Sequence, residues 1–425
     1  MRIAVIGAGI AGNSVAYQLH REHEVVVFEA ADWIGGHTHT VDVEWQRRTY
    51  AIDTGFIVFN DWTYPRFIEL LTQIGAASQP STMSFSVRCE RTRLEYNGTT
   101  LDTLFAQRSN LFRPSFHRML RDILRFNREA PGLLHDTRSP ELTLADYLTE
   151  QRYAPEFIAH YLTPMGAAIW STDPARMLEC PARFFIQFFA NHGMLSVNER
   201  PQWRVVRGGS RAYVEKLTAG FRDRIRTSTP VTAVRRRAGG VEVESAGGTQ
   251  RFDAVFFACH SDEALRLIKD PTSAERETLG AILYQSNDVV LHTDIRLLPQ
   301  RRRAWAAWNY HIPAREQSCV AVTYNMNMLQ SLDAPTTFCV TLNRTQDIDP
   351  RRILGRYTYR HPLYTAAAVA AQARQRELNG VRGLYFCGAY WRYGFHEDGV
   401  VSALSAVDHF RERQKHAQLS LRRLG

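Results

Sequence analysis

The chain has 425 residues, which is enough for two or three domains. Its content of 44% hydrophobic and 22% charged residues is typical of a folded globular protein and excludes a disordered or fibrous chain. The net charge of +9 suits an anionic surface or ligand, but no nucleic-acid-binding signature lies near the arginine triplets 235–237 and 301–303, so we expect no nucleic-acid partner.

The chain carries no sign of membrane insertion, secretion or metal binding. Its richest apolar stretch, residues 184–190, is far shorter than a membrane-spanning helix. The first residues resemble a strand and not a signal peptide. The six cysteines are scattered without a Cys-x-x-Cys pair, so we expect no zinc site and no metal. We therefore expect a cytoplasmic protein, with peripheral attachment to the inner face of the membrane as an open alternative.

The N-terminal segment has the pattern of a dinucleotide-binding unit. An apolar run from Arg2 to Ile6 predicts a strand, a glycine loop and a helix to His20 follow, and residues 24–28 predict a second strand that ends at Glu29. In such a unit the glycines allow a tight turn, close approach of a pyrophosphate and close packing of helix on strand, while the acid binds ribose hydroxyls. The predicted nucleotide-binding residues here are Gly7, Gly9, Ala11, Gly12 and Glu29.

This fingerprint alone does not distinguish FAD from NAD. Two later glycine motifs favour FAD. The first follows Glu29 at the spacing found in flavoproteins like glutathione reductase. The second is a predicted strand and tight turn near the C-terminus, followed by a helix that we expect to start at a glycine and to leave its first amides free for an anionic flavin edge. These motifs add Gly36, His37, Gly55, Phe56, Gly388, Gly399 and Val400 to the predicted cofactor site.

At this point the sequence resembles the flavin-containing amine oxidase superfamily, and within it a bacterial group of predicted NAD/FAD-binding oxidoreductases associated with fatty-acid-modifying enzymes. The resemblance covers the whole chain and rests on Gly36–Asp42, Ala168–Ser171, Asn191–Gly193, Gly208–Ser210, Ala258–Asp262, Leu291–Asp294 and Gly394–Gly399. It implies FAD as the cofactor and adenine contact through the backbone of Val231. His37 stands where relatives often carry arginine.

The resemblance also implies the fold class: an α/β protein whose Rossmann-like, glutathione-reductase-like FAD-binding domain is combined with a discontinuous α+β substrate domain of the amine-oxidase type. We expect residues 1–80, 202–268 and 378–425 to form the FAD-binding domain. Residues 81–201 and 269–377 are expected to form the substrate domain. Only one dinucleotide fingerprint is present, so oxygen, a quinone or a carrier is the expected electron acceptor.

The candidate catalytic residues are His396, Tyr390, Trp391 and Glu397, because the last strand and the following helix should bracket the flavin ring. His396 has the best intrinsic pKa for acid or base chemistry. As structural alternatives, Trp391 only packs beside the flavin, and Glu397 is an acidic residue favoured at the start of a helix by the helix dipole. His37 and His39 alternate as on a strand, but no third metal ligand accompanies them.

A basic amphipathic helix is predicted from Pro114 to Pro131, with an apolar stripe opposite a row of arginines. Its apolar side chains suit either the protein core or an anionic membrane. The phenylalanine-rich residues 184–189 suit either an apolar tunnel or the core.

The resemblance extends to a plant form fused to a cyclopropane fatty-acid synthase domain, which implies a lipid acyl substrate and a fatty-acid methyltransferase or cyclopropane synthase partner. We therefore predict an FAD-dependent oxidoreductase that abstracts a hydride from a lipid or modified fatty acyl chain. Amine oxidases of the superfamily commonly place a lysine near the flavin, and none of Lys216, Lys269 and Lys415 lies in a fitting strand. The alternatives are an oxidase or isomerase acting on an amine, a porphyrinogen or a polyene, and a non-catalytic flavin-containing protein that binds lipid beside a methyltransferase.

Overall fold

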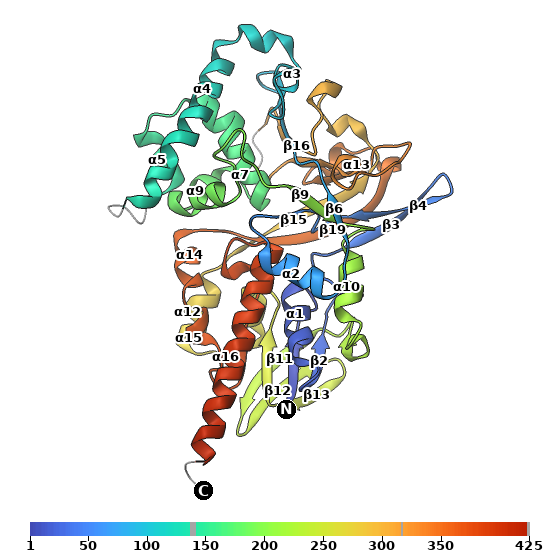
Figure 1. Cartoon of the computed structure of the whole chain (residues 1–425), viewed down its shortest axis with the longest axis vertical. Coiled ribbons are helices and arrows are strands. Elements are labelled where there is room, and N and C mark those ends of the chain that lie inside the picture. Colours follow the sequence, from blue (N-terminus) through green and yellow to red (C-terminus); the bar gives the residue numbers. More distant parts are fainter. Residues whose placement is uncertain (137–141, 316–317, 423–425) are drawn as a thin grey trace.

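A computed structural model describes residues 1–136, 142–315 and 318–422. Figure 1 shows two halves, with the N-terminus and the long helix α16 (His396–Arg422) in the lower half. A second sheet and a group of helices form the upper half. Strands β15 (Tyr284–His292) and β19 (Ile353–Pro362) lie where the two halves meet.

The lower half is built on a five-stranded parallel sheet. Its strands come from the first, middle and last parts of the chain and lie in the order β10 (Ile225–Arg226), β2 (Glu24–Phe28), β1 (Arg2–Ile6), β14 (Ala254–Phe257) and β20 (Leu384–Phe386). Successive side chains of a strand point to opposite faces, so β1 contributes Ile3 and Val5 to one core and Ala4 and Ile6 to another.

Different elements cover the two faces of this sheet. Helix α1 (Ile10–Leu19) packs beside α16 on one face, where Val15, Val407 and Phe410 are buried. The other face is covered by an antiparallel sheet and three helices, namely β11 (Val231–Arg237), β12 (Gly240–Ser245), β13 (Gly248–Phe252), α11 (Ser261–Leu267), α12 (Ser273–Gly280) and α14 (Ala366–Gln372). The predicted Rossmann-like α/β fold is confirmed.

The upper half contains a seven-stranded mixed sheet. Its strands are, in order, β19, β15, β18 (Cys339–Leu342), β17 (Val322–Asn325), β16 (Trp308–Ile312), β7 (Phe85–Cys89) and β8 (Leu94–Asn97). Two smaller sheets accompany it: the hairpin of β3 (Thr40–Trp45) and β4 (Arg48–Asp53), and the group of β5 (Phe59–Asn60), β9 (Trp203–Val206) and β6 (Ser78–Pro80).

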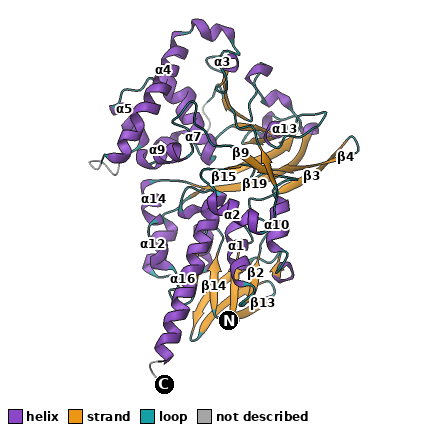
Figure 2. Cartoon of the chain, in the orientation of Figure 1, coloured by secondary structure: helices purple, strands orange, loops and turns teal. Residues whose placement is uncertain are grey.

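A layer of helices lies beside the seven-stranded sheet (Figure 2). It comprises α4 (Pro114–Glu129), α5 (Leu144–Glu150), α6 (Pro155–Phe157), α7 (Thr163–Trp170), α8 (Pro174–Leu178) and α9 (Ala182–Asn191). Phe185, Ile186 and Phe189 are fully buried in its core, so these members of the phenylalanine-rich segment pack against protein. Other short helices connect the sheets: α2 (Pro65–Gln73), α3 (Leu101–Leu104), α10 (Arg211–Thr218), α13 (Met326–Leu329) and α15 (Gln375–Leu378).

The amphipathic pattern of α4 correctly predicts a helix, and the structure shows what covers its apolar face. Phe116, Met119 and Phe126 are buried against neighbouring elements, and Leu120 and Ile123 pack beside them. Most of the stripe therefore belongs to the protein core, while Leu124 is 58% exposed. None of the helices in the described ranges combines the length and apolar character that a membrane span requires.

The aromatic and β-branched residues between Arg251 and Cys259 predict a single strand, and this prediction is wrong in extent. Residues 251–259 form two strands, β13 and β14, which belong to different sheets and are separated at Asp253. The Asp253 carboxylate accepts a hydrogen bond from the backbone amide of Arg2 at 2.7 Å, and this bond fixes the break beside the first residue of β1. The hydrophobic pattern of the segment does not show this change of partner.

Candidate active site

The first glycine loop joins β1 to α1 at the carboxyl edge of the parallel sheet. Gly7 has φ +104°, a conformation that favours glycine. Gly9 precedes α1, and no side chain caps the first turn of this helix. A Cβ on Gly12 would overlap the carbonyl oxygen of Gly7. The loop thus presents backbone amides and a helix N-terminus without an intervening side chain, which is the arrangement that binds phosphate.

The second glycine loop lies directly against the first. Gly9 and Gly35 form an isolated parallel bridge. Gly36 has φ +60°, and a Cβ at this position would lie 3.1 Å from the Cα of Gly9. The two loops therefore touch through bare backbone, and any larger residue at Gly36 would push them apart.

Glu29 lies at the end of β2 and reaches back to the first glycine loop. Its carboxylate accepts hydrogen bonds from the backbone amides of Ala8, at 2.7 Å, and Ala31, at 2.9 Å. The backbone amide of Thr229 donates to the carbonyl oxygen of Glu29 at 2.8 Å, which holds the chain just before Val231 beside the acid. The predicted ribose-binding acid and the predicted adenine-contacting strand are thus adjacent in the fold.

His396 is buried at the start of α16, away from open solvent. Its ring stacks on Phe56 with centroids 3.4 Å apart, and its Nε2 lies 2.8 Å from Thr38 Oγ1 and 3.1 Å from Tyr213 Oη. Burial lowers the pKa of His396 well below its ordinary value. The neutral ring is positioned by two hydroxyl groups, and a Cβ on the adjacent Gly55 would overlap the carbonyl oxygen of His37.

Helix α16 starts earlier than the sequence analysis predicts. The helix begins at His396 and not at Gly399, and the Gly399 amide donates to the carbonyl oxygen of Phe395 at 3.1 Å, so it is not free. Gly399 instead gives room for Ile10, because a Cβ there would lie 2.7 Å from its Cγ2 atom. Val400 is buried in the same cluster as Ile10. These two residues therefore bring the beginnings of α1 and α16 together.

Glu397 is engaged by a neighbouring helix. Its carboxylate accepts hydrogen bonds from the amides of Arg66, at 3.1 Å, and Phe67, at 2.8 Å, in the first turn of α2. Asp398 accepts a bond from the Phe395 amide at 2.9 Å, and burial raises the pKa of Asp398 to about 7. The two acids organise helix ends, so the helix-start alternative for Glu397 describes its position better than a reacting group does.

Tyr390 and Trp391 follow β20 and are both buried. The turn that leads to them begins at Gly388, which has φ +155° and whose amide donates to Ser402 Oγ at 2.9 Å. The Oη of Tyr390 and the Nε1 of Trp391 have no hydrogen-bond partner within the described chain. The two rings lie next to each other, with centroids 5.1 Å apart, in the buried cluster that covers one face of the parallel sheet.

Three histidines from distant segments meet beside the second glycine loop. The ring of His37 lies 5.9 Å from that of His260 and 5.4 Å from that of His361. His260 also stacks on Tyr284 with centroids 4.4 Å apart. Burial lowers the pKa of His37 and of His260 to about 4 and that of His361 to about 3, so the three rings are neutral near pH 7. We refer to these three residues as the histidine cluster.

His37 and His39 do not point at a shared metal position. His39 stacks on Trp33 with centroids 4.4 Å apart and bonds through Nδ1 to Tyr359 Oη at 2.9 Å. Within the described ranges, no group of three or more metal-ligating side chains is arranged to hold an ion.

Aromatic rings from α7, from α9 and from the segments after β19 and β20 pack against one another. We call this mostly buried group the aromatic wall: Trp170, Phe184, Phe188, Tyr364, Tyr393 and Phe395. The Trp170 indole donates to the carbonyl oxygen of Tyr393 at 3.0 Å, which ties α7 to the segment after β20. Phe395 packs both against this helical layer and against the cluster that contains Ile10. The wall therefore reaches the N-terminal end of α1.

A small pocket opens beside the wall. It is lined by Trp170, Thr172, Arg176, Met177, Glu179, Cys180 and residues 362–365. Two of its lining residues, Trp170 and Tyr364, belong to the wall. The three lysines are elsewhere: the Lys216 side chain bonds to the carbonyl oxygen of Gly75, Lys269 follows α11, and Lys415 is near the end of α16.

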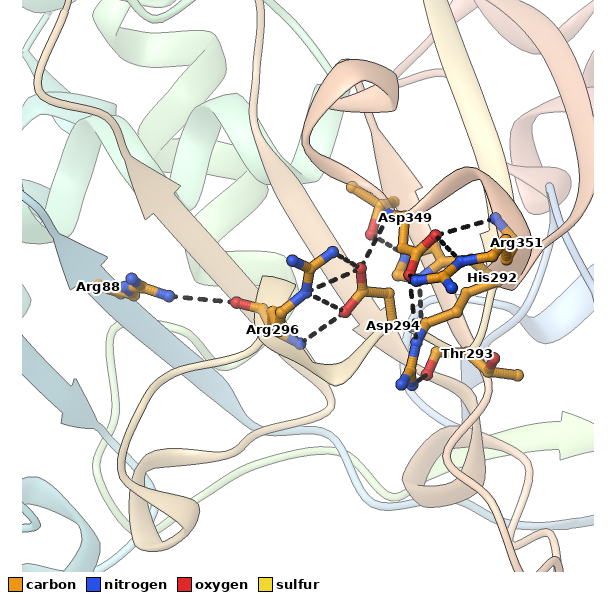
Figure 3. Close-up of polar contacts among 9 residues, drawn as sticks. Arg88, His292, Thr293, Asp294, Arg296, Asp349 and Arg351 are labelled. Carbon is orange, nitrogen blue, oxygen red and sulfur yellow. Dashed lines mark hydrogen bonds and ion pairs between the residues drawn. The ribbon is translucent and has the colours of Figure 1, made fainter.

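The motif at residues 291–294 lies away from this region. In Figure 3 the Asp294 carboxylate faces Arg296, and it also accepts the Asp349 amide at 2.9 Å. The hydrogen bonds to Arg296 hold the pKa of Asp294 well below its usual value. His292 is at the opposite end of β15 from Tyr284, roughly 26 Å along the strand at about 3.3 Å per residue. This motif stabilises a turn at the edge of the seven-stranded sheet.

The residues at the carboxyl edge fit FAD. The two glycine loops provide a cradle without side chains, Glu29 provides an acceptor for ribose, and Ser14 Oγ, Tyr390 Oη and Trp391 Nε1 are buried without a partner in the described chain. The glycine loops, Glu29 and Ser14 lie at the beginning of α1 and the end of β2, and Tyr390 and Trp391 lie in the segment after β20. A phosphate-containing nucleotide with a polar ring system supplies the matching groups.

Comparison with known proteins agrees with this assignment. Residues 10–302 match the family described as flavin containing amine oxidoreductase. The chain therefore belongs to that family. It is an FAD-dependent oxidoreductase. A search of curated proteins with the sequence found no match.

Solved structures support the same fold. Cyclohexylamine oxidase from Brevibacterium oxydans IH-35A has a TM-score of 0.69 and 16% identity, covering 97% of this chain and 99% of that one. A putative protoporphyrinogen oxidase from Exiguobacterium sp. 255-15 gives the same four values. A CLA-producing fatty acid isomerase from P. acnes has a TM-score of 0.65 and 14% identity, covering 96% of this chain and 98% of that one.

Several residues of the site were not identified from the sequence. Thr38 and Tyr213 hold His396, His260 and His361 complete the histidine cluster, and Phe395 links the aromatic wall to α1. Thr38, His260 and Phe395 lie inside motifs that carry the family resemblance. The motifs therefore indicate that these residues belong to the site, but the sequence does not show which side chains contact one another.

Proposed function

We propose that this enzyme removes a hydride from a lipid or modified fatty acyl chain. The observation that carries the proposal is the aromatic wall, a group of packed aromatic side chains that borders the small pocket at Trp170 and Tyr364 and reaches the first turn of α1 through Phe395. Burial of an acyl chain against such rings contributes roughly 25 cal/mol per Å² of apolar surface. No lysine accompanies the wall, since all three lie elsewhere.

FAD accepts the hydride in this chemistry. The chain's own task is to position the substrate carbon and to exclude water. A hydride leaves more readily from an allylic or otherwise activated carbon than from a plain methylene, so an unsaturated or methyl-branched chain is the favoured substrate. The pocket beside Trp170 and Tyr364 supports an entry route to the wall for such a chain.

The predicted site roles form part of this proposal. His396 holds the region between Phe56 and α16, and Tyr390 and Trp391 offer their unpaired polar atoms to the flavin. The discontinuous division into FAD-binding and substrate domains remains a proposal as well. The sheet that combines β1, β2, β14 and β20 supports it.

The test is anaerobic incubation of the purified holoprotein with unsaturated and methyl-branched phospholipids and fatty acids. We expect bleaching of the flavin absorbance, and Phe395→Ala should slow the bleaching about tenfold while FAD remains bound. Phe395→Tyr is the matched control, because it keeps the ring and should stay within a few-fold of the original rate. Absence of bleaching with the whole lipid panel would contradict the proposal.

A second candidate is oxidation or isomerisation of a porphyrinogen or polyene, which the aromatic wall also favours because both are large and apolar. Amine oxidation is the third substrate class, suggested by the structural similarity to cyclohexylamine oxidase. Adding a porphyrinogen, a carotenoid and several amines to the same anaerobic assay distinguishes the classes by which compound reduces the flavin.

We further propose a fatty-acid methyltransferase or cyclopropane synthase as a functional partner that supplies the modified chain. The family resemblance supports this partner. Co-purification of the two proteins, with lipid extraction of the complex, is the corresponding test.

A further inference from the structure

A cluster of exposed apolar side chains lies at one end of the molecule. Leu101 begins α3, and Leu111 and Phe112 end the short 3₁₀ helix η1 (Arg108–Phe112). Phe112 is 86% exposed and Leu101 is 77% exposed, the two highest values among the large apolar side chains of the described residues. Leu111 is 45% exposed. Figure 1 places α3 and the beginning of α4 at the end opposite the C-terminus.

Arginines surround these apolar side chains. Arg108 and Arg303 both pair with Asp102, at 2.6 Å and 3.3 Å, which places the arginine triplet 301–303 beside α3. Arg113 donates to the carbonyl oxygen of Thr92 at 3.3 Å, which places the β7–β8 turn beside η1. We define the basic tip as Leu101, Leu111 and Phe112 together with Arg91, Arg93, Arg108, Arg113, Arg302 and Arg303.

The charge at the basic tip is largely uncompensated. Residues 88–125 contain eight arginines and four acidic residues. Two of those acids, Glu95 and Asp122, are buried and face inward. Arg91, Arg93 and Arg302 form no ion pair within the described ranges, and Arg91 and Arg93 are fully on the surface of their turn. The basic tip is therefore positive around an apolar centre.

The basic tip is also distinct from the amphipathic face of α4. Phe116 and Met119 of α4 are buried against neighbouring elements, so these side chains are not available at the surface. Phe112 and Leu101 point away from this core, where nothing in the described chain covers them. An exposed Phe–Leu group within a ring of arginines matches the boundary of an anionic bilayer, where the apolar side chains enter the acyl region and the guanidinium groups bind lipid phosphates.

We propose that the basic tip is the surface by which this protein docks on an anionic lipid membrane. Phe112 and Leu101 insert, and the arginines of the β7–β8 turn, η1 and the 301–303 segment contact the headgroups. This docking does not depend on the identity of the substrate.

The experiment is vesicle flotation of the FAD-loaded full chain. Vesicles of phosphatidylcholine alone are compared with vesicles of phosphatidylcholine and phosphatidylglycerol, at low and at high salt. Phe112→Asp tests insertion, and the pair Arg91→Glu with Arg93→Glu tests the charge. Val197→Asp is the matched control, since Val197 is also an exposed apolar residue but lies outside the basic tip.

We expect binding to the anionic vesicles, a loss of at least about tenfold for Phe112→Asp and for the double arginine variant, and no loss for Val197→Asp. Salt should weaken binding of the unmodified protein. Flavin absorbance and the thermal midpoint verify that each variant is folded. Failure of the unmodified protein to bind anionic vesicles at low salt would overturn the proposal. Undiminished binding of Phe112→Asp would also overturn it, because adsorption by charge alone does not need the apolar centre.

Discussion

Glu29 combines two functions at the level of a single residue. It fixes the first glycine loop through the Ala8 amide, and it offers an acceptor where the ribose of FAD is expected. The segment before Val231 is held beside it by backbone hydrogen bonds. Through its carboxylate and its backbone carbonyl, Glu29 therefore links the first glycine loop, the end of the second strand and the segment before Val231.

We expect Glu29→Ala to weaken FAD binding at least about tenfold, because a hydrogen bond to a charged group contributes roughly 1.5 to 3 kcal/mol. Retention of FAD after dilution, followed by absorbance, measures the effect. Glu24→Ala is the control, since Glu24 lies on the same strand but is exposed and pairs only with Arg2. Equal FAD retention by the two variants would contradict the assignment of ribose binding to Glu29.

The histidine cluster predicts a pH dependence of stability. Unfolded histidines take up protons near pH 6.5, whereas burial keeps the pKa of His37 near 4, so acidification favours the unfolded chain. Each such group removes up to about 1.4 kcal/mol of stability per pH unit as the pH falls from 6.5 to 4. Burial raises the pKa of Asp53 to about 6 and of Asp398 to about 7, which gives a contribution of opposite sign.

The substitution His37→Gln separates the contribution of His37 to the pH dependence of stability from those of the other buried groups. His37→Gln should lose stability less steeply than the unmodified protein between pH 6.5 and 4, because it takes up no proton on unfolding. Urea unfolding at a series of pH values in the FAD-free protein measures the two slopes. Parallel stability curves for both proteins would show that His37 is protonated in the folded state, against the burial argument.

At the level of secondary structure, the start of α16 organises much of the site. His396 contacts the second glycine loop through Thr38, Glu397 caps α2, and Gly399 admits Ile10 of α1. One helical turn therefore fixes the relative positions of two other helices and a loop.

We expect Glu397→Ala to lower the free energy of unfolding by about 1 to 2 kcal/mol, because it removes the acceptor for two amides of the first turn of α2. Glu397→Gln keeps one acceptor oxygen and should lose less. Flavin reduction by substrate should change by less than about threefold in the Gln variant. A large fall in reduction with unchanged stability would instead assign Glu397 to the reacting site.

The N-terminal unit was predictable because its signals are local. The strand, the glycine loop, α1, β2 and Glu29 follow one another within the first 29 residues, and each has a residue pattern of its own. The histidine cluster was not predictable, because residues 37, 260 and 361 meet only after two sheets have formed. The predicted start of α16 at Gly399 is wrong because Glu397 and Asp398 lie in its first turn and the helix begins at His396. Periodicity identified the apolar face of α4 but not its covering partner.

On the scale of the whole molecule, the residues proposed to hold FAD extend from the first glycine loop to the segment after β20. Ligands that bind only the folded state increase stability with their concentration, by about 2.7 kcal/mol at one hundred times the Kd. The thermal midpoint of the FAD-free protein should therefore rise with added FAD. Scanning fluorimetry measures this rise.

Gly12→Ala should abolish the rise in the thermal midpoint, since a Cβ there would overlap the Gly7 carbonyl oxygen. Gly98→Ala is the control, because Gly98 has open space around it and follows β8 in the upper half of the molecule. A midpoint that does not respond to FAD in the unmodified protein would contradict a site formed from both ends of the chain.

The position of β20 has a consequence for synthesis on the ribosome. This edge strand of the parallel sheet and the helix after it are translated more than 350 residues after β1. Until they emerge, β14 has an unpaired backbone edge and the apolar side of α1 lacks its covering helix, features that promote aggregation of nascent chains. We therefore expect the growing polypeptide to depend on chaperones until β20 and α16 have been released.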